Sequence, residues 1–235
     1  MGRKYLANVN FRKRMSFLAA GALVVVLCAA LATRAIAVNP AAQPALMKTA
    51  ATALPAPGIY KVDSAHSFTY FGARHHVVGL VRGRFDKVTG NITVSPDPAA
   101  CSVDIVIDVS SISTQNKERD QDLLSPVYFD VDKFSTMTYQ GRGIRHVSAN
   151  SWIMDGSLTL HGVTKIVPLT FTFNGVFPAM PPDQPVRVAF HGMAGVKRAE
   201  FGMGARDNLE ELGVLTTPDV EIQIDVEADA HPAAQ

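Results

Sequence analysis

Hydrophobic and polar residues alternate with a period of two along most of the chain after Gly58. The clearest example is 103–109 (VDIVIDV), in which Val and Ile occupy every second position against Asp104 and Asp108. Such alternation predicts a β-strand with one buried face. Similar segments predict further strands at 59–63, 66–74, 80–85, 88–94, 136–147, 152–161, 166–176, 186–196 and 220–226.

The segment Ser110 to Val131 interrupts this alternation and is predicted to contain one short helix. Thr114 or Asn116 can cap its start, because a short side-chain oxygen there accepts a hydrogen bond from a free backbone amide. Glu118 adds a favourable negative charge in the first turn, and the proline at 126 ends the segment. A helix this short is not stable alone in water, so we expect it to pack against the neighbouring strands.

Many strands with a single helix predict an all-β fold, either an antiparallel barrel or a sandwich. An open sheet of this size has two unpaired edges, and closing it into a barrel removes them. The predicted strands mix large apolar residues with small ones such as Gly72, Ala73, Gly83, Gly90 and Gly156, a mixture that permits a cavity. An eight-stranded barrel with such a mixture has room for one ligand.

The first 37 residues have the composition of a secretory signal. Basic residues precede an uncharged run from Met15 to Thr33, and Ala35-Ile36-Ala37 offers small residues at a cleavage site. We expect cleavage after Ala37; an uncleaved membrane anchor is the alternative, because Arg34 lies between the apolar run and the cleavage site. Residues 38–57, rich in Ala and Pro, predict a linker, 58–228 the folded domain, and 229–235 a C-terminal tail.

Removal of residues 1–37 leaves 198 residues with 16 Lys and Arg against 21 Asp and Glu, a formal net charge of −5. A negative charge of this kind gives no electrostatic basis for binding nucleic acid. Cys101 is then the one remaining cysteine and cannot form an internal disulfide. Stability must therefore come from buried apolar surface.

Several motifs occur in one order along the folded part of the chain. They are VRGRF at 81–85, SISTQNKERDQDL at 111–123, FDV at 129–131, GSLTLHGVTK at 156–165 and RAEFGM at 198–203. Together they resemble the YceI-like family over about residues 58–228. The resemblance implies an extended, eight-stranded, lipocalin-like antiparallel barrel that carries a polyisoprenoid lipid in its lumen. It also implies a periplasmic or secreted protein, homodimeric, in transient contact with the inner membrane, with no cofactor besides the lipid.

Strand parity within this barrel selects the side chains expected to line the lumen. They are Phe71, Phe85, Ile105, Ile107, Leu158, Phe171 and Phe173, with Tyr128 and Phe129 beneath the helix. His75 and Arg198 are the candidates for contact with a lipid head group. Arg198 has an alternative role in an ion pair with Glu200 or Asp207. Arg119 and Asp120 are expected to tie the helix to a neighbouring strand rather than to gate the lumen.

The sequence gives no basis for a metal site or a catalytic centre. His75 and His76 are adjacent and point to opposite faces of a strand, which is poor geometry for joint ligation. His66, His161 and His191 have no spacing that brings them together. There is no nucleophile elbow and no dinucleotide-binding fingerprint.

Two other functions stay open. The first is an isomerase- or hydrolase-like enzyme that uses the same cavity, with His75, His161 or Glu200 as proton carriers. The second is a stress-response scaffold with a filled core and no ligand. Binding of a lipid without chemistry is the leading hypothesis.

Overall fold

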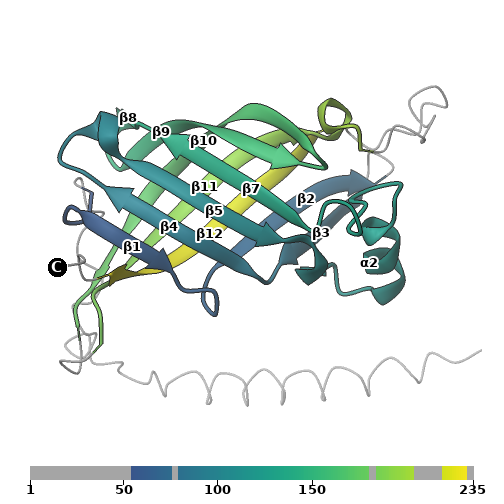
Figure 1. Cartoon of the computed structure of the whole chain (residues 1–235), viewed down its shortest axis with the longest axis horizontal. Coiled ribbons are helices and arrows are strands. Elements are labelled where there is room, and N and C mark those ends of the chain that lie inside the picture. The colour runs from purple at the N-terminus through teal and green to yellow at the C-terminus, as the bar shows by residue number, and fades with distance from the viewer. Residues whose placement is uncertain (1–53, 76–78, 180–183, 204–218, 232–235) are drawn as a thin grey trace, which may run out of the picture. The chain divides into compact units, whose positions relative to one another are not determined.

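The strands form one antiparallel sheet that closes on itself (Figure 1). The computed structural model describes residues 54–75, 79–179, 184–203 and 219–231. The strands are β1 Gly58–Val62, β2 Phe68–His75, β3 Gly79–Phe85, β4 Val88–Val94, β5 Ser102–Asp108, β6 Ile112–Ser113, β7 Thr136–Arg142, β8 Arg145–Ser148, β9 Ser151–Leu160, β10 Val163–Phe177, β11 Arg187–Lys197 and β12 Asp219–His231. The helix is α2 Lys117–Leu124, and short 3₁₀ turns occupy Pro98–Ala100, Val109–Ser111 and Arg198–Phe201.

Strand β12 closes the barrel. One edge of β12 pairs with β11 along its whole length, and the other edge pairs with β2 and then with β1. Phe68 of β2 lies opposite Asp225, and Val62 of β1 lies opposite Ala228, so β1 and β2 together act as one barrel strand. In the same way, β3 and β4 form one barrel strand, and β5 and β6 form the next. The barrel is therefore eight-stranded, as predicted.

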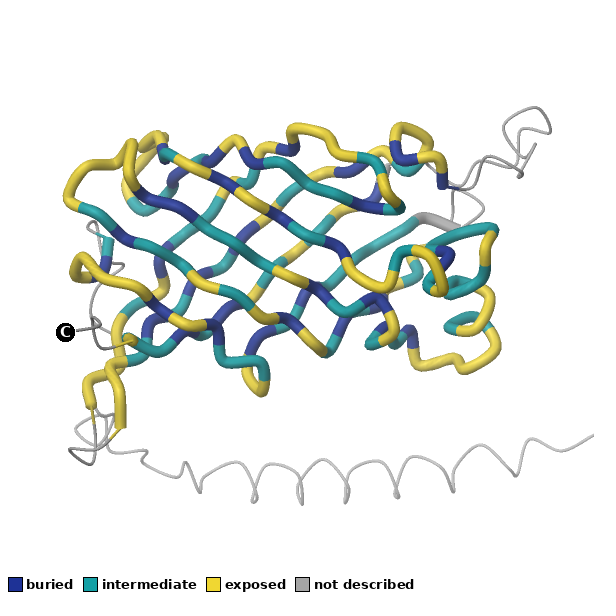
Figure 2. Tube along the Cα trace, in the orientation of Figure 1, coloured by how far each residue is buried: buried dark blue, intermediate teal, exposed yellow. Residues whose placement is uncertain are grey.

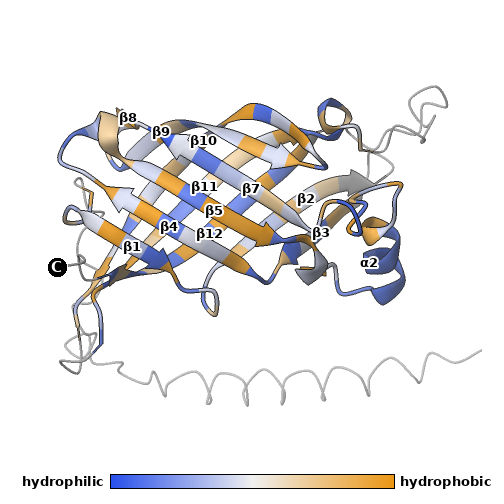
Figure 3. Ribbon diagram, viewed as in Figure 1, coloured by the Kyte–Doolittle hydropathy of each residue, from blue (hydrophilic) through white to orange (hydrophobic). Residues whose placement is uncertain are grey.

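The two faces of the sheet differ in burial and hydropathy. Along β7 and β9 buried residues alternate with more exposed ones, and the trace shows the same alternation on neighbouring strands (Figure 2). Burial of one face of each strand is the main source of stability, since every apolar side chain removed from water contributes about 1.5–3 kcal/mol. Figure 3 shows apolar and polar segments crossing the barrel wall side by side.

Helix α2 lies at the end of the barrel opposite β8 and the start of β1 (Figure 1). Asn116 caps it, because its side chain accepts a hydrogen bond from the amide of Arg119. No residue of α2 is fully buried, and the helix is strongly hydrophilic (Figure 3), so its fixed position depends on a few contacts. Leu123 and Leu124 pack against the core.

Arg119 and Asp120 join this helix to the residue that follows β6. The Asp120 carboxylate accepts hydrogen bonds from the Thr114 amide (2.8 Å) and hydroxyl (2.6 Å). The Arg119 guanidinium donates to the Thr114 hydroxyl (2.8 Å) and carbonyl (2.9 Å). Thr114 is 4% exposed, so these contacts are partly shielded from water.

The structure places three boundaries differently from the sequence pattern. The segment 136–147 forms two strands, because the backbone turns at Gly143, whose φ is +73°. Leu54 packs against the core and Pro55 is buried, so the last residues of the expected linker belong to the barrel. Strand β12 continues to His231, inside the expected tail. The signal and the rest of the linker lie outside the described residues.

Within the part of the chain that the structure describes, no helix has both the length and the apolar character needed to cross a membrane.

Candidate functional site

The interior of the barrel is hollow. Several apolar residues pack against the core but are only partly buried, because part of their inner surface lines a cavity. They include Ile105, Leu158, Leu169, Ile222 and Ile224. A filled core of the same size would bury such residues almost completely. The space they enclose is divided between two cavities.

The first cavity lies toward the end of the barrel where β1 begins. It contains about 820 Å³ of space not occupied by atoms, its opening included. Leu54 and Val94 line it near that end, with Phe171 and Phe190 deeper in the barrel. Cys101 also lines it; the thiol accepts a hydrogen bond from the Ser95 amide (3.4 Å), which indicates a structural role.

The second cavity lies at the α2 end and contains about 970 Å³, its opening included. Leu123 of α2 and the following residues Tyr128 and Phe129 form part of its wall. Phe71 and Phe85 line it on the strand side, with their rings 5.6 Å apart. The short helix therefore helps to enclose this cavity.

Eight of the nine residues predicted to line the lumen line one of these cavities. Ile105 and Phe171 line the first, Ile107 lines both, and the second is lined by Phe71, Phe85, Tyr128, Phe129 and Leu158. Phe173 lines neither cavity. It is 2% exposed and packs against the Phe190 ring (5.4 Å), close to the irregularity where β10 and β11 change register.

Tyr139 is a central lining residue that the sequence analysis did not select. Its ring lies over Gly156 of β9, and its hydroxyl lies 3.0 Å from the carbonyl oxygen of Val167 and 3.2 Å from that of Met154. Burial raises the pKa of Tyr139 to about 12, so the hydroxyl keeps its proton and serves as a donor. The loose alternation of 136–147 gave no signal for this contact, because it depends on strand register.

Two polar side chains besides the tyrosines line the otherwise apolar second cavity. Arg198 and Thr69 both line it. Nε of Arg198 and the hydroxyl of Thr69 are buried and make no hydrogen bond within the described part of the chain. No ion pair joins Arg198 to Glu200 there, and Asp207 lies outside the described residues. The side chain of the other head-group candidate, His75, is also outside them.

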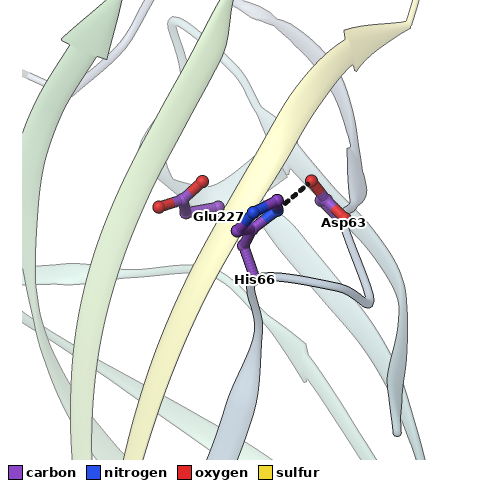
Figure 4. Close-up of side chains that lie close together, drawn as sticks. All are labelled: Asp63, His66 and Glu227. Atoms are coloured by element: carbon purple, nitrogen blue, oxygen red, sulfur yellow. Dashed lines mark hydrogen bonds and ion pairs between the residues drawn. The ribbon is translucent and has the colours of Figure 1, made fainter.

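A cluster of charged residues lies where β1 meets β12. Asp63, His66 and Glu227 each offer a nitrogen or oxygen atom within 4.8 Å of the others. Figure 4 shows the three side chains and the contact between His66 and Asp63. The Arg187 guanidinium contacts the carboxylates of Asp63 (2.7 Å), Glu227 (3.0 Å) and Asp229 (2.7 Å). The positive charge of Arg187 already balances the carboxylates that a metal ion would need as ligands. This arrangement therefore favours a structural ion-pair network over a metal site.

The ionisation of this network follows from its contacts. Burial acts to raise the pKa of Asp63, but hydrogen bonds from His66 and from the Ala65 amide, together with the Arg187 charge, bring it below the ordinary value. Hydrogen bonding to Asp229, opposed by desolvation and helped by the charges of Asp229 and Asp63, raises the pKa of Arg187. Asp63 and Arg187 are therefore both ionised near neutral pH, and their opposite charges stabilise the network.

The three histidines considered for a shared site occupy separate places. Nδ1 of His66 lies 2.8 Å from Asp63, and Nδ1 of His191 lies 2.7 Å from Asp225 on the outer face of the barrel. Nδ1 of His161 lies 3.1 Å from the Phe201 carbonyl oxygen, with the Phe134 ring against it. These contacts assign each histidine a local partner.

Comparison with known proteins gives consistent matches. The model of the YceI-like domain matches residues 60–228. A UPF0312 protein of Yersinia enterocolitica is 32% identical over 162 residues, which cover 68% of this chain and 82% of that protein. A UPF0312 protein of Vibrio vulnificus is 28% identical over 169 residues, which cover 71% of this chain and 85% of that protein.

Solved structures of the same fold include three bacterial proteins. Burkholderia cenocepacia BcnA has a TM-score of 0.60 at 22% identity, covering 71% of this chain and 99% of that one. A Campylobacter jejuni YceI protein has a TM-score of 0.56 at 26% identity, covering 66% of this chain and 88% of that one. A polyisoprenoid binding domain from Saccharophagus degradans has a TM-score of 0.55 at 18% identity, covering 73% of this chain and 98% of that one. With the domain match extending over nearly the whole described barrel, the chain belongs to the YceI-like family.

Proposed function

We propose that this protein binds a polyisoprenoid-type lipid, such as an isoprenoid quinone or a polyprenyl phosphate, in its lumen without changing it chemically. The observation that carries the proposal is a pair of apolar cavities that follow one another along the barrel. The two cavities share four lining residues where they meet. Bound lipid would be shielded from water and carried between a membrane and an acceptor. The polyisoprenoid binding domain of similar fold supports this ligand class.

Burial of the lipid tail supplies the binding energy. Each methylene group removed from water contributes about 0.8 kcal/mol. A tail that fills even one cavity is held without any strong polar contact, because the lining is almost entirely apolar.

The polar end of the ligand is assigned to the α2 end of the barrel. Arg198 lines the second cavity there, and a guanidinium in apolar surroundings is stabilised by an anion such as a phosphate. His75, at the end of β2, stays a second head-group candidate. The tail would then extend from this end toward the first cavity.

The cellular setting belongs to the same proposal. A cleaved signal would release the protein into the periplasm or outside the cell, and an uncleaved one would anchor it at the inner membrane. Either arrangement gives access to isoprenoid lipids by transient membrane contact. A homodimer is the expected assembly, and N-terminal sequencing of the exported protein distinguishes the cleaved from the anchored form.

The open lumen favours a carrier over a scaffold with a filled core. An enzyme that uses the same cavity would need a proton carrier in it. Of the three candidates, His161 and Glu200 line neither cavity described, and the side chain of His75 lies outside the described residues. Arg198 and Tyr139 do line the cavities. The contacts of the described residues therefore support binding more directly than catalysis.

Native mass spectrometry of the exported protein tests the proposal. We expect a reproducible hydrophobic adduct that is lost in Leu158→Glu, because an apolar tail in the second cavity would strip water from an unpaired carboxylate. Ile166→Glu is the matched control, since Ile166 is 65% exposed and leaves the lumen unchanged. Absence of any adduct from the wild-type protein after incubation with isoprenoid lipids, or equal retention by both variants, would contradict the proposal.

A further inference from the structure

The two cavities meet at one layer of side chains. Ile107 of β5, Tyr139 of β7, Leu169 of β10 and Ile224 of β12 line both cavities, and we call these four residues the waist. On β10, Phe171 on one side of the waist lines the first cavity and Val167 on the other side lines the second. On β12, Val226 lines the first cavity and Ile222 lines the second. A chain that occupies both cavities must therefore pass the waist.

Two of the waist residues lie over glycines of the neighbouring strands. A Cβ atom at Gly156 would lie 2.2 Å from Cζ of Tyr139, which is too close for any side chain. A Cβ atom at Gly192 would lie 3.1 Å from Cδ1 of Leu169 and 3.8 Å from Cβ of Ile224. Neither glycine has a positive φ, so the requirement at both positions is space rather than backbone conformation.

The Tyr139 ring is fixed in this position from its far end. Its hydroxyl reaches the carbonyl oxygens of Met154 and Val167, on the two strands beyond β7. The ring thus lies along the barrel wall, over Gly156, instead of crossing the lumen. A side chain at 156 would displace the ring toward the lumen and break its hydrogen bonds.

We propose that Gly156 and Gly192 set the aperture of the waist and thereby determine how long a lipid chain the lumen accepts. This inference rests on the proposed function and adds a specificity determinant to it. With glycine at both positions a slender chain runs through both cavities. With a larger residue at either position the waist closes, and the chain is confined to one cavity.

Retention of isoprenoid alcohols of increasing length tests this inference. The probes are geraniol, farnesol, geranylgeraniol and solanesol, added to the full chain and quantified by native mass spectrometry. In the wild-type protein we expect retention to rise with each added isoprene unit, including the units that make the chain too long for one cavity. In Gly192→Val the rise should stop earlier, with the longest prenol retained about tenfold less and the shortest changed by less than about twofold.

Gly195→Val is the matched control on the same strand. Gly195 is exposed, and nothing lies within 4 Å of a Cβ atom placed there, so the same atoms are added outside the lumen. Its length profile should equal that of the wild-type protein. Thermal unfolding of each variant shows whether it is folded, and Gly156→Ala or Leu169→Phe narrows the same waist if Gly192→Val does not fold.

The outcomes separate this inference from the function on which it rests. A wild-type protein that retains no prenol of any length overturns the proposed function and the inference with it. A wild-type protein that retains long prenols, with unchanged length profiles in the folded waist variants, overturns the inference alone. A shortened profile in these variants and not in Gly195→Val supports both.

Discussion

The guanidinium of Arg187 and the carboxylate of Asp229 form two parallel hydrogen bonds, 2.7 Å from Nε to Oδ1 and 3.0 Å from Nη2 to Oδ2. The two residues face each other on β11 and β12, next to the place where β1 pairs with β12. Because Arg187 also contacts Asp63 at the end of β1, it connects both sides of the strand that closes the barrel.

Replacement of Arg187 should therefore destabilise the barrel. We expect Arg187→Ala to lower the free energy of unfolding by about 1–3 kcal/mol, because three partly buried carboxylates lose their partner. Arg187→Lys should recover only part of this, since an ammonium group cannot make the two parallel bonds. Urea denaturation provides the measurement.

Arg145→Ala is the control for this loss. The Arg145–Asp155 ion pair is well exposed on both sides, so its removal should change stability by less than about 1 kcal/mol. Equal destabilisation by the two alanine variants would show that the Arg187 network has no special role in closure.

Asp63 predicts a dependence of stability on pH. Its pKa is lower in the folded protein than the ordinary value of 3.8, so its contribution is complete above that value and is lost as pH falls through the folded pKa. Asp63→Asn should be less stable than wild type near neutral pH, and the difference should shrink below about pH 3.8. Thermal melts across this range test it; a constant difference at all pH values would contradict it.

The Asp120–Thr114 contact should hold the α2 end of the second cavity in place. In Asp120→Ala the Thr114 amide loses its acceptor inside a nearly buried site, at a cost of about 1–3 kcal/mol to the local structure. We expect faster amide hydrogen exchange in residues 114–131. Glu118→Ala, on the exposed side of the same helix, is the control and should change exchange little; identical exchange in both variants would count against this role.

Arg198 should discriminate between lipid head groups. We expect Arg198→Gln to lower the retention of a prenyl phosphate about tenfold or more while leaving the corresponding neutral prenol nearly unchanged, since only the phosphate loses a charged partner. Lys197→Gln removes the same charge from an exposed neighbouring position and should affect neither lipid. Similar losses for both lipids in Arg198→Gln would indicate that Arg198 acts on the lumen as a whole.

Sequence and structure agree where local chemistry decides the outcome. The period of two located the strands, and strand parity placed Ile105, Ile107 and Leu158 toward the lumen. Of the two predicted helix caps, Asn116 is the one that caps α2. The family motifs added the closed, eight-stranded form that periodicity alone left open between a barrel and a sandwich.

The features that the sequence analysis missed depend on register between distant strands. Tyr139 lies over Gly156, 17 positions further along the chain, and no local pattern signals that pair. Arg187 binds Asp63 from a strand more than 100 residues away, so its network was equally hidden. Phe173 shares the parity of Phe171 but packs on Phe190 near the β10–β11 irregularity, which parity cannot reveal.

The pairing of β12 with both β1 and β2 has a consequence for how the protein folds. Strands β1 and β2 must meet β12 before the sheet has no free edge, so the barrel cannot close while β12 is still being synthesised. Until then two edges remain available to other chains, and the half-built sheet is the species most prone to aggregate. Closure of the barrel therefore has to wait until β12 is available for pairing.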